Sequence, residues 1–217
     1  MRVLTVDPLN PDPAVLRTAA QALAHGLIVA FPTDTLYGLA VDPRNPRAVE
    51  RLYAVKGRGF DRPLPLIAAD QAQVSACAGS LTPLAGRLAA QFWPGPLTLV
   101  VPAHPSLDSR VHGFTGHVAV RVPAHALACA LARVAGHPIT ATSANISGEP
   151  AAATAADVSR ALAGQIDILL DGGSTVGGLP STIIDVTGAT PVLIRAGVVA
   201  WERVLEFVKC PPSRDMS

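Results

Sequence analysis

Short apolar runs alternate with segments that begin with helix-start signals, and this alternation constrains the fold more than any other feature of the sequence. Each run has five to seven residues and is bounded by polar residues, Pro or Gly, as expected of buried strands. The runs are 27–31, 64–69, 97–101, 117–122, 138–142, 166–171, 181–186 and 191–197. Helices are predicted to begin at Asp12-Pro13, Asn45-Pro46, Asp70 and Thr82-Pro83, because an N-cap residue, often followed by proline, marks a helix N-terminus.

Further helices are expected over 124–135, over 155–163 and in a short segment that ends near Val208. Strands that alternate with helices, with adjacent strand runs near the end, predict an α/β fold with a twisted mixed sheet and flanking helices. No linker or repeat divides the chain, so residues 1–217 are expected to form one domain. Its ordered core is expected over about 8–208 and a frayed tail over 209–217.

Composition excludes several classes of protein. Hydrophobic residues make up 49% and charged residues 15%, which fits neither a disordered nor a strongly solvated chain. The net charge of +1 is too small for a general nucleic-acid-binding protein, so an anion site has to arise from local clustering. Neither the 3 cysteines nor the 6 histidines show metal-ligand spacing, so no metal site is predicted.

The sequence also bears on where the protein acts. No apolar run reaches the ~18–20 residues of a membrane span, and the N-terminus lacks the apolar core of a signal peptide. These features predict a soluble, cytoplasmic protein. In that compartment the sequon Asn145-Ile146-Ser147 is not expected to carry a sugar.

Two polar clusters in the first half of the chain interrupt the apolar pattern. Thr33 lies in the stretch 31–38, directly after a strand run, where its hydroxyl could face a ligand; a β-turn followed by a capped helix is the alternative. Lys56, Arg58 and Arg62 lie within seven residues, a density that favours a loop closing over phosphates. The alternative for this second cluster is a solvated basic loop.

Two more clusters lie in the second half. Arg121 and Arg195 each fall inside an apolar run, which predicts a carboxylate or phosphate partner; a structural salt bridge is the alternative. The stretch 141–145 follows a short strand, and its hydroxyls, amide and backbone N–H groups could bind phosphate oxygens. No catalytic triad, paired acids or metal spacing accompanies these clusters. The combination favours binding and alignment of anionic substrates over covalent catalysis.

Taken together, the clusters resemble the YrdC/TsaC family of threonylcarbamoyl-AMP synthases. Six stretches carry the resemblance in order over nearly the whole chain: FPTDTLYGL (31–39), KGR and RPL (56–64), FWPGPLTLV (92–100), VAVRVP (118–123), TSANISGEP (142–150) and STIIDV with LIRAG (181–197). Each stretch is weak alone, but six in register are specific.

The resemblance implies a twisted mixed α/β sheet around a concave, basic cavity. It implies an enzyme that condenses L-threonine, bicarbonate or carbon dioxide, and ATP into threonylcarbamoyl-AMP and pyrophosphate. Mg²⁺ is expected to accompany ATP. A partner complex then passes the threonylcarbamoyl group to an adenosine beside the anticodon of tRNA, and weak binding of double-stranded RNA is a further expectation.

The resemblance also implies roles for individual residues. Lys56 and Arg58 are expected to hold the ATP phosphates and to supply most of the catalysis. Thr33 is expected to contact threonine, and Arg121, assisted by Ser181, to pair with its carboxylate. The remaining residues expected around the nucleotide are Ala141, Ser143, Asn145 and Arg195.

The chain departs from the family pattern at three positions. Gly59 replaces the proline that often follows the arginine of the basic loop, Ile67 replaces a frequent histidine, and His117 replaces a small hydroxyl residue. The longer family form adds a C-terminal domain, and this sequence is expected to represent the short, single-domain form. Two alternatives stay open: an RNA-binding module of the same fold, and a related enzyme that forms a carbamoyl-adenylate from another substrate.

Overall fold

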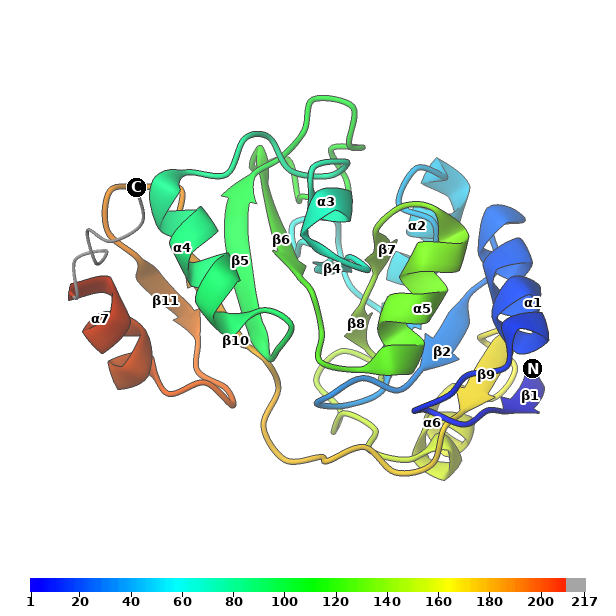
Figure 1. Cartoon of the computed structure of the whole chain (residues 1–217). Helices are drawn as coiled ribbons and strands as arrows, with labels where there is room; N and C mark the ends of the chain where they lie inside the picture. Colours follow the sequence, from blue (N-terminus) through cyan, green and yellow to red (C-terminus); the bar gives the residue numbers. More distant parts are fainter. Residues whose placement is uncertain (210–217) are drawn as a thin grey trace.

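The computed structural model of the chain describes residues 1–209 and contains two β-sheets with flanking helices (Figure 1). Cys210 and the rest of the expected tail lie outside the described residues. Within residues 1–209, no helix is long and apolar enough to cross a membrane.

Both sheets mix parallel and antiparallel pairs, which confirms the predicted fold class. The first sheet has the strand order β1 (Arg2–Thr5), β9 (Ile168–Asp171), β2 (Val29–Phe31), β3 (Gly38–Ala40), β8 (Thr142–Ser143). The second has the order β11 (Val192–Arg195), β10 (Thr182–Asp185), β5 (Leu97–Pro102), β6 (His117–Arg121), β4 (Leu66–Ile67), β7 (Ile139–Thr140).

The expected single sheet is therefore divided, and the predicted strand over 138–142 shows how. This run breaks at Ala141, so that β7 pairs with β4 in the second sheet and β8 pairs with β3 in the first. The N–H of Ala141 donates to the carbonyl oxygen of Pro65 at 2.8 Å and so extends the β4–β7 pairing by one residue before β8 begins. One short run thus links both sheets, an arrangement that a period-2 pattern does not reveal.

Two further strands were not predicted. β1 pairs with β9 in parallel, so regular structure begins before the expected start of the core near residue 8. β3 follows the 31–38 turn and pairs antiparallel with β2, which corrects the alternative of a turn followed by a capped helix. Both strands are short, and β3 is bounded by Gly38, so neither has the length of a typical apolar strand pattern.

The helices begin where the cap signals predicted. Asp12, Asn45 and Thr82 each accept a hydrogen bond from a first-turn N–H, with proline at the next position. Gly57 ends the second helix in the left-handed conformation, at φ 59°. The helices are α1 (Pro13–Ala24), α2 (Pro46–Lys56), α3 (Gln71–Val74), α4 (Pro83–Phe92), α5 (Ala126–Ala135), α6 (Ala155–Leu162) and α7 (Trp201–Lys209).

Two apolar clusters form the core. The smaller one lies where α1 and α5 pack side by side against the first sheet, and Leu23 and Leu131 are buried in it (Figure 1). The larger one includes Leu52 of α2, Leu88 of α4 and Leu99 of β5. These clusters hold the two sheets together around the cavity described next.

Candidate functional site

A cavity of about 420 Å³ lies on one face of the second sheet. Alternate residues of three neighbouring strands form its floor, because side chains at i and i+2 share a face. The strand register places Ile183 beside Thr98, and Asp185 beside Val100, which in turn pairs with Ala119. The walls come from the turn after β2, the loop after α2, the link between β7 and β8, and residues 180–181.

Most of the predicted site residues meet in this cavity, although they come from distant parts of the chain. Those that line it are Thr33, Arg58, Arg121, Ala141, Ser143, Ser181 and Arg195. Lys56 and Asn145 do not line it; both are buried behind Ser143. Clustering along the sequence therefore predicted the cavity but not which of its cations face the space inside.

Arg121 forms a buried ion pair with Asp34, the structural alternative that the sequence left open. Its Nη1 donates to Oδ1 of Asp34 at 2.7 Å, and the two side chains are 8% and 11% exposed. Its Nη2 lies 3.3 Å from the hydroxyl oxygen of Thr33 and 3.4 Å from that of Thr35. The carboxylate of Asp34 thus occupies one end of the guanidinium, although Arg121 still lines the cavity.

Thr33 organises the turn after β2. Its Oγ1 accepts from the N–H groups of Thr35 and Leu36, and donates to the carbonyl of Leu36 at 2.7 Å. These bonds hold the turn that carries Asp34 to Arg121. Thr33 therefore supports the position of Arg121 as well as lining the cavity.

Ser181 and Arg195 form a second polar unit at the cavity rim. Nη2 of Arg195 donates to the carbonyl oxygen of Ser181 at 2.8 Å and to its hydroxyl at 3.0 Å. The hydroxyl of Thr98 lies 2.9 Å from that of Ser181. A Cβ at Gly197 would lie 2.2 Å from the carbonyl oxygen of Pro180, so only glycine permits this close approach.

Arg58 reaches the cavity from the loop after α2. Its guanidinium lies 5.5 Å from the ring centroid of Tyr53, and its Nη2 makes long contacts of 3.4 Å to the carbonyl of Pro63 and 3.5 Å to the hydroxyl of Thr142. Its Nε is buried without a hydrogen-bond partner within residues 1–209. A buried N–H without an acceptor is costly, so Arg58 is suited to an anionic ligand.

Lys56 holds the segment that carries Ser143. Its Nζ donates to the carbonyl oxygens of Ser143 and Asn145, both at 2.6 Å, and to Oδ1 of Asn145 at 2.7 Å. The hydroxyl of Ser143 also donates to this Oδ1, at 2.6 Å. Burial, and to a smaller extent Arg58, lowers the pKa of Lys56 to about 7. Lys56 and Asn145 thus form the inner support of the wall.

The backbone N–H groups at 141–145 do not all face the cavity, as the sequence had suggested. The N–H of Ala144 donates to Tyr37, and that of Asn145 donates to Ser143, in addition to the bond from Ala141 to Pro65. These bonds close the turn, and the stretch contributes the polar residues Thr142 and Ser143 to the lining. The Asn145 amide is only 7% exposed, so the sequon is not accessible in this fold.

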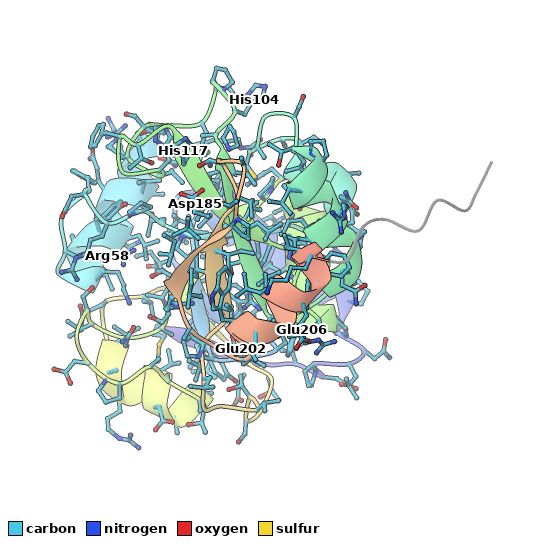
Figure 2. All side chains as sticks on the ribbon, turned by 90° about the vertical axis from the view of Figure 1, so that its left-hand side faces the viewer. Arg58, His104, His117, Asp185, Glu202 and Glu206 are labelled. Carbon is cyan, nitrogen blue, oxygen red and sulfur yellow. The ribbon has the colours of Figure 1, made fainter. Side chains whose placement is uncertain are left out.

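The charged groups that line the cavity are mostly cationic. Its lining includes three arginines and one carboxylate, that of Asp185, within the described part of the chain. Partial burial and the charge of Arg121 lower the pKa of Arg195, because both cations lie near the same space. Figure 2 shows Arg58, Asp185 and His117 around this region, with Glu202 and Glu206 apart from them on α7. Such a site favours a polyanionic ligand.

Sequence reasoning missed three residues of the site. Asp34, Thr98 and Asp185 were not singled out, although Asp34 is the neighbour of Thr33 in the 31–38 stretch. The polar side chains of Thr98 and Asp185 at alternate positions of apolar runs were the available signal. Of the three departures from the family pattern, Ile67 and His117 line the cavity, whereas Gly59 does not. Residues 1–209 bring together no group of three or more His, Cys, Asp or Glu side chains that could hold a metal.

Known proteins resemble this chain closely. A threonylcarbamoyl-AMP synthase of Pyrococcus abyssi is 41% identical over 89% of this chain and 57% of its own length. One of Bacillus subtilis is 40% identical over 91% of this chain and 58% of its own length. The crystal structure of P. abyssi Sua5 complexed with L-threonine superposes with a TM-score of 0.92 at 38% identity, over 96% of this chain and 61% of that one.

This chain therefore spans less than two thirds of the length of these relatives. A family model described as telomere recombination, that of Sua5, YciO and YrdC, matches residues 21–197. This match covers all six stretches that carried the resemblance, so the resemblance is confirmed. The chain belongs to the Sua5/YciO/YrdC family.

Proposed function

We propose that this protein is a threonylcarbamoyl-AMP synthase, which condenses L-threonine, carbon dioxide or bicarbonate, and ATP. The observation that carries the proposal is the cavity itself. Three guanidinium groups and several hydroxyls face one space, with no activated nucleophile among the lining residues described. The names of the 41% and 40% identical relatives support the same activity.

The chemistry needs no nucleophile from the protein. The amine of threonine attacks carbon dioxide and loses a proton, which gives a carbamate. A carbamate oxygen then attacks the α-phosphorus of ATP, the bond to the β-phosphate oxygen breaks, and pyrophosphate leaves. Alignment of the substrates and neutralisation of the phosphate charge supply the rate enhancement.

Arg58 and Arg195 are assigned to the triphosphate, together with the hydroxyl of Ser143. Arg58 suits this role because its buried Nε lacks an acceptor. Lys56 and Asn145 act from behind Ser143, because their hydrogen bonds hold that segment and not the cavity space. Ala141 lines the same wall. A charge-assisted bond to a phosphate oxygen is stronger than a neutral one, so Arg58 is expected to contribute most.

Threonine is assigned to the side of the cavity where Arg121, Thr33 and Ser181 lie. Arg121 keeps donors beyond the bond to Asp34, since a guanidinium carries five N–H groups. These can bind the carboxylate of the amino acid. Ile67 makes this region more apolar than a histidine would, so a different amino acid is the second candidate substrate.

Two expectations extend the proposal beyond the cavity. Mg²⁺ is expected to accompany ATP, since it neutralises phosphate charge in such reactions. The product is expected to serve threonylcarbamoyl transfer to a tRNA adenosine through a partner complex. Both follow from the family resemblance alone.

The direct test is mass spectrometry of the purified protein incubated with threonine, ¹³C-bicarbonate, ATP and Mg²⁺. Threonylcarbamoyl-AMP that carries one ¹³C is the expected product, and it should be absent when any substrate is omitted. A panel of other amino acids in competition decides the substrate. No product in any mixture, together with a salt-dependent affinity for tRNA that ATP does not change, would favour an RNA-binding module instead.

A further inference from the structure

Asp185 is the carboxylate of a cavity that is otherwise lined by cations, hydroxyls and apolar groups. It is the acidic residue among the lining residues within 1–209. Figure 2 places its label between those of Arg58 and His117, well away from Glu202 and Glu206. The roles assigned above leave this carboxylate unused.

The Asp185 side chain is held in place by Thr187, which lies just beyond the end of β10. Oδ1 of Asp185 accepts from the N–H of Thr187 at 2.8 Å and from its hydroxyl at 2.6 Å. No arginine, lysine or histidine nitrogen within residues 1–209 forms a salt bridge with Asp185. One carboxylate oxygen is therefore fixed by the protein, and Oδ2 remains free to bind a ligand.

Asp185 lines the same cavity of about 420 Å³ as Arg58 and Arg195, the two arginines assigned to the triphosphate. It lies two residues beyond Ile183 on the same face of β10, while the Arg195 guanidinium reaches the other way along that strand, to Ser181. A carboxylate that shares so small a cavity with a polyphosphate repels it, unless a cation lies between the two.

Mg²⁺ is the cation that fits these oxygens. It is usually held by one or two carboxylates together with substrate phosphates and several waters. A single carboxylate with no nitrogen or sulfur ligand beside it suits this mode, and it does not suit a resident transition-metal site. We propose that Asp185 binds, through Oδ2, the divalent cation that accompanies the triphosphate of the nucleotide.

This inference rests on the proposed nucleotide site and deepens it. Asp185→Asn is the decisive variant, because the amide oxygen can still accept from Thr187 while the negative charge is lost. Glu202→Gln is the matched control, since this exposed carboxyl lies on α7 outside the cavity lining. Thermal unfolding should show both variants folded.

The experiment is isothermal titration of ATP into each protein, in Mg²⁺ and in EDTA, with adenosine as a third ligand. Wild-type protein and Glu202→Gln should bind ATP at least about 10-fold more tightly in Mg²⁺ than in EDTA. Asp185→Asn should lose this difference. In EDTA it should bind ATP at least as tightly as the wild type, because the repulsion is gone.

Other outcomes overturn the inference in distinguishable ways. If Asp185→Asn lost the same ATP affinity in both buffers, or bound adenosine more weakly than the wild type, Asp185 would be a hydrogen-bond acceptor for the nucleoside. An unchanged Mg²⁺ dependence in Asp185→Asn would also exclude the cation role while the nucleotide site stands. A wild-type protein that binds ATP in neither buffer would overturn the nucleotide site and this inference together.

Discussion

Arg121 and Arg58 line the same cavity but differ in what neutralises them. Arg121 lies on the floor, where Asp34 and two threonine hydroxyls take some of its donors. Arg58 lies on the wall without a carboxylate within salt-bridge distance in residues 1–209, and its Nε has no acceptor. The fold itself supplies the counter-charge of Arg121, whereas Arg58 has none at that distance among the described residues and depends on a ligand for it.

The comparison separates stability from binding. Removal of one partner of a buried ion pair strongly destabilises the folded protein, because the remaining charge stays buried without a counter-charge. A cation without a partner contributes little to folding, so its loss should affect binding instead. The two arginines therefore predict opposite balances of these effects, and two experiments test them. A third concerns Lys56, the buried cation behind the cavity wall.

Asp34→Ala should have the largest effect on folding. It leaves the 8%-exposed guanidinium of Arg121 without its counter-charge, which costs about 3–5 kcal/mol of unfolding free energy. Urea unfolding measures this loss. Asp34→Asn should lose clearly less, because its amide oxygen can still accept from Arg121, although the bond that the second carboxylate oxygen accepts from the N–H of Ala124 is lost.

The control for this prediction is Glu206→Ala, on the exposed side of α7 (Figure 2), which should change stability by less than ~0.5 kcal/mol. If Asp34→Ala were as stable as this control, the ion pair would not be part of the fold's support.

Arg58→Met should have an intermediate effect, and mainly on binding. Stability should stay within about 1 kcal/mol of the wild type, the size of the contact with Tyr53. ATP affinity should fall about 10- to 100-fold, as expected for the loss of charge-assisted hydrogen bonds. Calorimetry with ATP and thermal unfolding measure the two effects separately.

Arg62→Met is the matched control, because Arg62 is exposed and lies outside the cavity lining. It should bind ATP like the wild type. Equal losses of affinity in both variants would mean that the loop's general charge attracts ATP, and not a specific contact of Arg58.

The smallest effect concerns Lys56. Burial and the charge of Arg58 lower the pKa of this side chain from 10.5 to about 7. Between these pH values the unfolded chain binds more protons than the folded one, so unfolding free energy should rise with pH. The rise should be about 1 kcal/mol between pH 7 and 8, and it should be absent in Lys56→Met.

The chain has two lysines, Lys56 and Lys209, so ¹³C-lysine labelling gives a direct measurement by NMR. The Lys56 signal should titrate near pH 7, and the Lys209 signal serves as the internal reference. A Lys56 signal that titrates near pH 10 would mean that its three acceptors outweigh its burial.

The helix starts could be predicted because they depend on neighbours. Asp12, Asn45 and Thr82 cap their helices through N–H groups two or three residues away, and proline at the next position reinforces them. The apolar runs predicted most strands for the same reason, since burial repeats along each run. The run at 138–142 escaped this reasoning, because two sheets share it.

The site was predictable only as a set of residues. Thr33, Arg58, Arg121 and Arg195 stand out as polar groups beside or within apolar runs, and the cavity collects them. Their division into paired and unpaired groups did not follow from the pattern. Asp34 and Lys56 illustrate this: one was overlooked, and the other was expected inside the cavity but lies behind its wall.

The sequence by itself determined the fold class, the helix boundaries and the group of residues around the cavity, because these follow from local periodicity, capping and motif order. Only the tertiary structure decided which charges are neutralised. Arg121 meets Asp34 across 87 residues, and Lys56 meets Asn145 across 89. The electrostatic state of a side chain depends on what the fold brings within a few ångströms, and no spacing along the chain specifies that partner.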